Sequence, residues 1–331
     1  MSEHKCFCGI DVSQATLAIA LLLPDGRCKV SSCNNTAADH RRLASQLANG
    51  PGPMLVVLEA TSTYGLDLAL TLHATPGLTV ALINPRAAHY FAGASMQRAK
   101  TDPLDAAGLA LLAQRLQPAA WQPPSELALQ LRDLGRRLAE LASLRKDEKN
   151  RLHAASQSRT GVAKAASLQR AIAWLDSELL RVEAEAMALL KRDPQLAEDF
   201  RLLDTAPGIA RRSAIELLGE FACLPPGLEP QQWVAMAGLD PRPVESGSSL
   251  CAPRRISRRG TPHIRATLFM CILSTIRCDP GAQRRYADLV ARGKPKRVAQ
   301  CALMRKMIHA LWAMLQYRQP WDSDRFGPRP A

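Results

Sequence analysis

The feature that most constrains the fold is a long stretch, residues 126–193, that has no proline and only two glycines, Gly135 and Gly161. Apolar residues recur in it every three or four positions, in two separate series. This spacing predicts two long helices, arranged as an antiparallel hairpin or a coiled-coil arm. An ordinary bundle inside one domain is the alternative. The two series are Leu127, Leu131, Leu134, Leu138, Leu141 and Leu144, then Ile172, Leu175, Leu179, Val182, Met187 and Leu190.

Strand and helix patterns alternate in the residues before that stretch. Three predicted strands follow one another through short turns, and later strands alternate with helical segments. This order predicts a mixed α/β sheet with helices on its faces. Asp102 is expected to be the N-cap of the last helix, with Pro103 at its first position. The strands are expected at residues 5–13, 16–23, 27–33, 54–60 and 78–84, and helices at 36–49, 63–75 and 102–116.

Three parts are predicted from these patterns. A proline-rich segment, residues 117–126, separates the α/β part from the long helices. After about residue 200 the sequence becomes mostly helical again, with loops between the helices. We therefore predict an α/β domain at 1–120, a helical coiled-coil or linker region at 121–195, and a mostly α domain at 196–331.

Basic residues are concentrated toward the C-terminus. The chain has 43 Lys and Arg against 30 Asp and Glu, and residues 251–310 alone hold 14 basic and two acidic residues. Such an imbalance predicts a surface that binds a polyanion, although a generally basic domain is the alternative. We find no pattern of a signal peptide or transmembrane helix, and we expect no membrane partner.

The cysteines predict a reducing, cytoplasmic environment. There are nine, an odd number without regular disulfide spacing. Four of them, Cys6, Cys8, Cys28 and Cys33, lie in one region. No histidine completes a zinc-binding pattern there, and alternation along a strand accounts for the first pair.

Four acidic residues fall at the ends of predicted elements. Asp11 and Glu59 end the first and fourth strands, and Asp102 and Asp105 begin the helix that follows the fifth. If these strands are neighbours and the helix packs across them, the four carboxylates converge. Crowded carboxylates suit Mg²⁺ or Mn²⁺, and two such ions can stabilise the attacking and leaving oxygens of a phosphoryl transfer. The alternative for the aspartate pair is a solvated helix start.

A second informative segment is residues 241–260, where Ser-Gly-Ser-Ser is surrounded by arginines. A glycine between serines predicts a flexible turn with exposed hydroxyls. Because arginine binds phosphate bidentately, a serine beside it could attack a phosphodiester. An ordinary loop is the alternative. The arginines are Arg242, Arg254, Arg255, Arg258 and Arg259.

The segment TAPGIARRSA, residues 205–214, resembles the turn of a helix-hairpin-helix element. In that element, backbone N–H groups at a helix start face a phosphate. Ala210 replaces the usual second glycine, whereas Arg211 and Arg212 would suit phosphate contact. A packing corner between two helices is the alternative.

The motifs GIDVSQ, LEATSTYG, INP and KTDPLDA resemble the DEDD domain of the Piv-like invertases and the bridge-RNA-guided insertion-sequence transposases. The resemblance runs from about residue 7 to about residue 320 and implies a RuvC-like, RNase H-type N-terminal domain. It implies that the catalytic and metal-binding tetrad is Asp11, Glu59, Asp102 and Asp105.

The same family has an ESGSS loop followed by arginine-rich sequence, as residues 245–260 do here. The resemblance implies that Ser246 is the nucleophile and forms a phosphoserine-linked strand. It also implies a composite site, with the acids and the serine supplied by different protomers. Two departures are Ser62, where the family often has glycine, and Pro253, which interrupts the segment after the serines.

The function implied is an RNA-guided DNA transposase or recombinase of a bacterial insertion sequence. Its partners would be donor and target DNA, a non-coding guide RNA encoded by the element, and further copies of the chain, as a dimer or a tetramer in the synaptic complex. The alternatives are a RuvC-like junction resolvase or nuclease that uses water, an invertase guided by protein contacts alone, and a non-catalytic nucleic-acid-binding protein.

Overall fold

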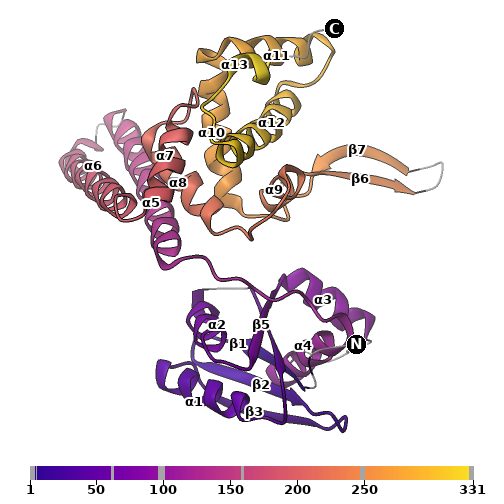
Figure 1. The fold of residues 1–331 in the computed structure, drawn as a ribbon. Helices are drawn as coiled ribbons and strands as arrows, with labels where there is room; N and C mark the ends of the chain where they lie inside the picture. The colour runs from indigo at the N-terminus through magenta and orange to yellow at the C-terminus, as the bar shows by residue number, and fades with distance from the viewer. Residues whose placement is uncertain are drawn as a thin grey trace. The chain divides into compact units, whose positions relative to one another are not determined.

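The chain forms two compact units, Met1–Pro123 and Pro124–Ala331 (Figure 1). No helix in the described part of the chain combines the length and the apolar character needed to cross a membrane. The computed structural model describes residues 4, 6–60, 63–95, 101–157, 160–246 and 250–327, without the side chains of 63, 162 and 243–254.

The first unit contains a five-stranded sheet in the order β3-β2-β1-β4-β5. The strands β1 (Cys6–Val12), β2 (Thr16–Leu22) and β3 (Cys28–Asn34) form an antiparallel meander. The strands β4 (Met54–Glu59) and β5 (Leu78–Ile83) continue the sheet parallel to β1. The predicted mixed sheet is therefore confirmed.

Helices cover both faces of this sheet. The helices α1 (Ala37–Ala48) and α2 (Leu66–His73), the latter preceded by the short η1 (Thr63–Gly65), share one core with the even-numbered residues of β1 and β4. The helices α3 (Pro85–Ala94) and α4 (Asp102–Leu116) share the opposite core with the odd-numbered residues. Because side chains alternate along a strand, this assignment fixes which face each site residue occupies.

The prediction that Asp102 caps α4 is wrong. Thr101 is the N-cap, Asp102 is the first helical residue and Pro103 the second. The helix therefore starts one residue earlier than predicted. Both Asp102 and Asp105 consequently lie in the first turn, where the helix dipole favours negative charge.

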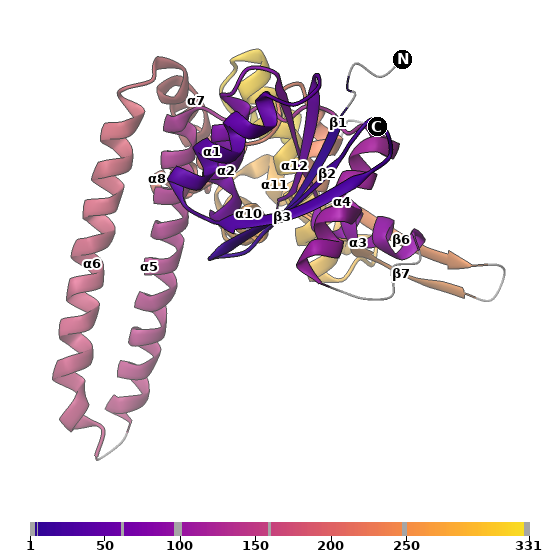
Figure 2. The same ribbon diagram turned by 90° about the horizontal axis from the view of Figure 1, so that it is seen from below.

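Two long helices open the second unit, as predicted. The helices α5 (Glu126–Ser156) and α6 (Val162–Leu190) lie side by side as an antiparallel pair (Figure 2). Residues of both helices also belong to the core of the unit, so the pair is at once a hairpin and part of a bundle. Leu144 departs from the predicted apolar stripe, because its side chain is 49% exposed.

Seven more helices and a β-hairpin complete the second unit as described, and one apolar core joins most of these helices to α5 and α6. The separation of residues 121–195 from 196–331 as two domains stays a prediction. The remaining elements are α7 (Pro194–Asp204), α8 (Arg211–Ala222), α9 (Pro230–Met236), β6 (Pro241–Ser246), β7 (Leu250–Ile256), α10 (Pro262–Cys278), α11 (Pro280–Ala291), α12 (Lys296–Tyr317) and α13 (Ser323–Phe326).

The close contact of α4 with β1 gives a first prediction. A Cβ added to Gly9 would lie 2.1 Å from the carbonyl oxygen of Ala106 and 2.3 Å from the nitrogen of Ala110. We expect Gly9→Val to lower the free energy of unfolding by about 3 kcal/mol, because the backbone of α4 must move away. The control is Gly93→Ala in α3, where a Cβ meets nothing within 4 Å. Chemical unfolding followed by circular dichroism measures both, and equal stability of the two variants would contradict the prediction.

Candidate active site

Two of the predicted acids lie at neighbouring strand ends. The strands β1 and β4 pair in parallel up to Ile10 and Leu58. The next residue is Asp11 on β1 and Glu59 on β4. The two acids therefore lie next to each other at the carboxyl ends of these neighbouring strands. Both side chains are half-buried. As odd-numbered residues, they share the sheet face that α3 and α4 cover.

The first turn of α4 lies on the same face, beyond Gly9. Phe7, at the start of β1, belongs to the core that contains Leu112 and Ala113 near the end of α4. Gly9, further along β1, instead meets Ala106 and Ala110. The helix therefore runs antiparallel to β1, and its first turn is directed toward Asp11. The structure thus brings all four acids to one face and one end of the sheet, with Asp102 exposed and Asp105 half-buried.

The chemistry of this set fits a magnesium-type ion, because hard carboxylate oxygens are the donors that Mg²⁺ and Mn²⁺ prefer. The side chains do not form a closed set of ligands as they stand. Within the described ranges, no group of three or more His, Cys, Asp or Glu side chains could hold a metal ion. Binding would therefore have to draw the side chains inward. Ser62, the departure from the family noted near Glu59, lies outside the described residues.

The residues on either side of the serine turn form a β-hairpin, and the predicted flexible turn itself, residues 247–249, lies outside the described residues. Strands β6 and β7 pair antiparallel, and Ser246, the last residue of β6, pairs with Leu250. The register shifts by one residue between Arg242 and Val244, opposite Pro253. Proline lacks an N–H group for the ladder, which explains the irregularity there. The hairpin extends away from the helices of its own unit in both views (Figures 1 and 2).

The base of the hairpin is held by backbone contacts with the segment after α9. The N–H of Ser257 donates to the carbonyl of Asp240 at 2.9 Å, and the N–H of Arg258 donates to Gly238 at 3.0 Å. A Cβ on Gly260 would lie 1.8 Å from the carbonyl oxygen of Met236, so only glycine fits there. The base of the hairpin is therefore fixed against the helices of the second unit.

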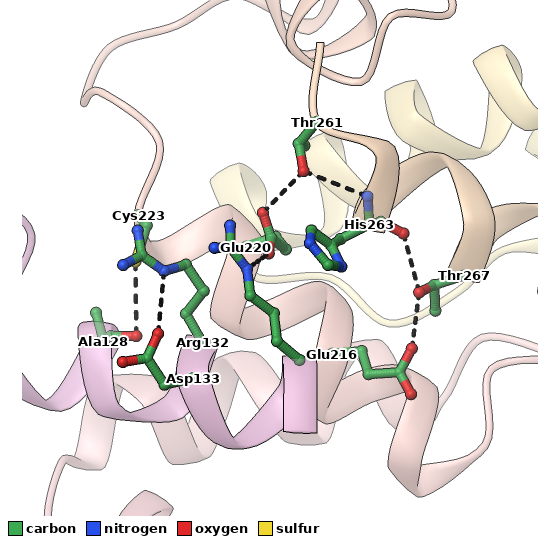
Figure 3. A network of polar contacts seen from close by, with 10 residues as sticks. Ala128, Arg132, Asp133, Glu216, Glu220, Cys223, Thr261, His263 and Thr267 are labelled. Carbon is green, nitrogen blue, oxygen red and sulfur yellow. Dashed lines mark hydrogen bonds and ion pairs between the residues drawn. The ribbon is translucent and has the colours of Figure 1, made fainter. Parts of the chain in front are cut away.

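A charged pair with a buried carboxylate lies next to this base. Arg136 of α5 donates to Glu220 of α8 at 2.6 Å, and Thr261, the N-cap of α10, donates to the same carboxylate at 3.3 Å (Figure 3). Glu220 is 7% exposed. These bonds connect the long helix α5 to the segment that leads out of β7.

A second carboxylate lies in the same network. Thr267 donates to Glu216 at 2.7 Å (Figure 3). Burial raises the pKa of Glu216, while the hydrogen bond from Thr267 and the charge of Arg212 oppose that shift without cancelling it. No local pattern in the sequence indicates this network, because its members come from three helices far apart in the chain.

The predicted phosphate-binding arginines fall into two groups. Arg242 and Arg255 are paired positions across the hairpin and are exposed. Arg258 and Arg259 are exposed at its base, and the side chain of Arg254 lies outside the described residues. The exposed arginines therefore place positive charge along the hairpin and at its base.

Arg211 and Arg212 instead contact Glu183 of α6. The Nε of Arg212 donates to this carboxylate at 2.7 Å, and Nη1 of Arg211 lies 3.5 Å from it. The turn before them packs on α10: a Cβ on Gly208 would lie 2.6 Å from the nitrogen of Thr275. The arrangement favours the packing-corner interpretation, and phosphate contact by these two arginines stays a prediction.

Comparison with known proteins gives matches over both units. A family model described as a transposase matches residues 8–157, and a model of the transposases of the IS116/IS110/IS902 family matches residues 200–287. The chain is similar to the pilin gene-inverting proteins of Moraxella bovis and Moraxella lacunata. It is 27% identical to each over 271 residues, which cover 81% of this chain and 81% of the relative.

The charged pair at the hairpin base gives a second prediction. We expect Arg136→Leu to lower the free energy of unfolding by on the order of 3 kcal/mol, because it leaves the carboxylate of Glu220 buried without its cation. The neighbouring Arg137 pairs with Glu140 at the surface, so Arg137→Leu should change stability by less than about 1 kcal/mol. Denaturant unfolding of the two variants compares them, and a similar loss in both would refute the assigned role.

Proposed function

The chain belongs to the IS116/IS110/IS902 family of transposases, enzymes of DNA phosphoryl transfer, and we propose that it is the RNA-guided recombinase of an insertion sequence. The observation that carries the proposal is the arrangement of Asp11, Glu59, Asp102 and Asp105. These acids come from three elements and reach one face of one sheet end. Convergence of four carboxylates from three separate elements supports a metal site over a solvated helix start.

We assign the nucleophile to Ser246, at the far end of β6. Its hydroxyl oxygen would form a bond to the phosphorus of a strand while the bond from phosphorus to a deoxyribose oxygen breaks and that oxygen takes up a proton. The hydroxyl of another strand would then displace the serine and restore a phosphodiester. The four carboxylates would hold Mg²⁺ or Mn²⁺, which when bound supplies positive charge to the phosphate undergoing substitution.

The exposed arginines of the hairpin suit contacts with phosphates, which position DNA but carry no sequence information. Recognition of donor and target DNA is therefore assigned to pairing with a guide RNA, as in other guided enzymes. The acids and the serine would come from different protomers, which requires at least a dimer and is compatible with a tetramer.

A second candidate function is DNA inversion guided by protein contacts alone. The printed names of the two Moraxella relatives, pilin gene-inverting proteins, favour it. It uses the same chemistry and needs no RNA. A resolvase that uses water instead of serine is the third candidate.

The serine step is tested by recombination between a donor and a target plasmid, with and without the RNA flanking the element. We expect Ser246→Ala to abolish both recombination and the covalent protein–DNA adduct, because no oxygen remains to attack phosphorus. Ser248→Ala in the same segment is the matched control and should retain activity. Full cleavage by Ser246→Ala would exclude the serine mechanism, and full activity without RNA would favour the inversion candidate.

The metal site is tested separately with Asp11→Asn and Asp102→Asn. We expect each to reduce recombination at least 100-fold, because loss of a ligand weakens the site. Asp25→Asn, in the exposed β2–β3 turn where Asp25 pairs with Arg27, is the control and should remain active. Unchanged activity and an unchanged Mg²⁺ requirement in the first two variants would refute the site. Mixing Asp11→Asn with Ser246→Ala should restore activity if the two halves come from different protomers.

A further inference from the structure

Aromatic side chains gather around the C-terminal end of α12. Aromatic residues make up 5% of the chain, yet six of them line two hollows there. The hollows have volumes of about 220 and 460 Å³. The aromatic residues are Phe221, Trp233, Trp312, Tyr317, Trp321 and Phe326.

Tyr317 lies between the two hollows and lines both. Its side chain is 63% exposed, so the face of its ring is accessible. One edge is supported by Trp312, whose ring centroid is 5.9 Å away in a T-shaped arrangement. The indole N–H of Trp312 donates to the carbonyl of Leu228 at 2.8 Å, so this support is itself fixed.

The wall of the smaller hollow is also held in place. The indole N–H of Trp321 donates to Asp279 at 3.1 Å, and its ring packs on Phe326 with centroids 4.7 Å apart. The backbone N–H of Trp321 donates to Thr205 at 3.0 Å. An aromatic wall with fixed orientation loses little conformational freedom when a flat ligand stacks on it.

Basic side chains complete the smaller hollow. Lys306 and Arg325 line it together with His309. The acidic residue among its described lining, Asp322, caps α13 and pairs with Arg325 at 3.1 Å. Burial lowers the pKa of His309, and Arg305 and Lys306 lower it further, so its ring is neutral at pH 7. The hollow therefore offers an aromatic surface beside Lys306 and the Arg325–Asp322 pair.

We infer that this surface binds an unpaired nucleotide of single-stranded nucleic acid, with the base against Tyr317 and a phosphate near Lys306 and Arg325. Stacking on aromatic side chains combined with basic groups along the backbone is the usual way in which proteins hold single strands. The volume of about 220 Å³ suits one ring system, since it is below the roughly 300–1,000 Å³ of pockets for larger ligands. The inference deepens the proposed function, because guided recombination exposes unpaired strands of both RNA and DNA.

The test is binding of the full-length chain to labelled oligonucleotides by fluorescence anisotropy, in EDTA so that neither metal nor cleavage contributes. The probes are oligo(U), oligo(dT) and a DNA duplex of the same length. We expect Tyr317→Ala to weaken binding of at least one single strand by about 5- to 150-fold and to leave duplex binding unchanged. Tyr317→Phe should bind normally, because its ring still stacks. The comparison of the U and dT probes identifies RNA or DNA as the ligand.

Trp174→Ala is the matched control, since Trp174 is an exposed aromatic residue of the same unit on α6. It should bind every probe like the parent chain. Unchanged binding of both single strands by Tyr317→Ala would overturn the inference, and so would an equal loss for single strands and duplex. Photocrosslinking of 4-thiouridine in the oligo(U) probe should label residues 306–326, and labelling confined to other segments would also overturn it. The binding measurements do not depend on recombination. If the serine and aspartate experiments contradict the proposed function, these measurements still test the nucleotide site, and the two proposals can be refuted separately.

Discussion

The contact of α4 with β1 is the constraint on which the candidate active site depends. Gly9 lets the backbone of α4 approach so closely that any side chain would meet Ala106 and Ala110. This approach sets the height of the helix above the sheet and therefore the position of its first turn. The turn carries Asp102 and Asp105 toward the strand ends where Asp11 and Glu59 lie. Close helix–strand packing is what brings their elements together.

The β6–β7 hairpin, which carries Ser246, is positioned by contacts at its base. A two-stranded hairpin is marginally stable alone, so its direction depends on its base. The base is fixed by backbone hydrogen bonds to residues 238–240 and by the pair of Arg136 and Glu220, whose carboxylate is buried. Buried ion pairs contribute little net stability when intact but are costly to break. The pair consequently makes the orientation of Thr261, five residues beyond β7, sensitive to the position of α5.

The sequence predicted most of the first unit, because each element there carries a local signal and parallel strands bring their carboxyl ends to the same edge. That rule was enough to place Asp11 beside Glu59. The β6–β7 hairpin could not be predicted in the same way, since Pro243 and Pro253 both argue against strands. The Arg136–Glu220 pair was also inaccessible, because its partners are 84 residues apart and neither is unusual locally. The aromatic cluster around Tyr317 could not be predicted either, because the overall aromatic content is low and its members come together only in the folded chain.

The two parts of the chain differ in net charge. Residues 1–120 hold nine basic and eight acidic residues, whereas residues 121–331 hold 34 and 22. Four carboxylates on a nearly neutral domain would repel phosphate unless a cation joined them, because like charges at close range are costly. The strongly basic part attracts nucleic acid without any metal, through release of counterions. In the proposed function, the basic part would therefore bind nucleic acid and the four acids of the first unit would supply the metal-dependent chemistry.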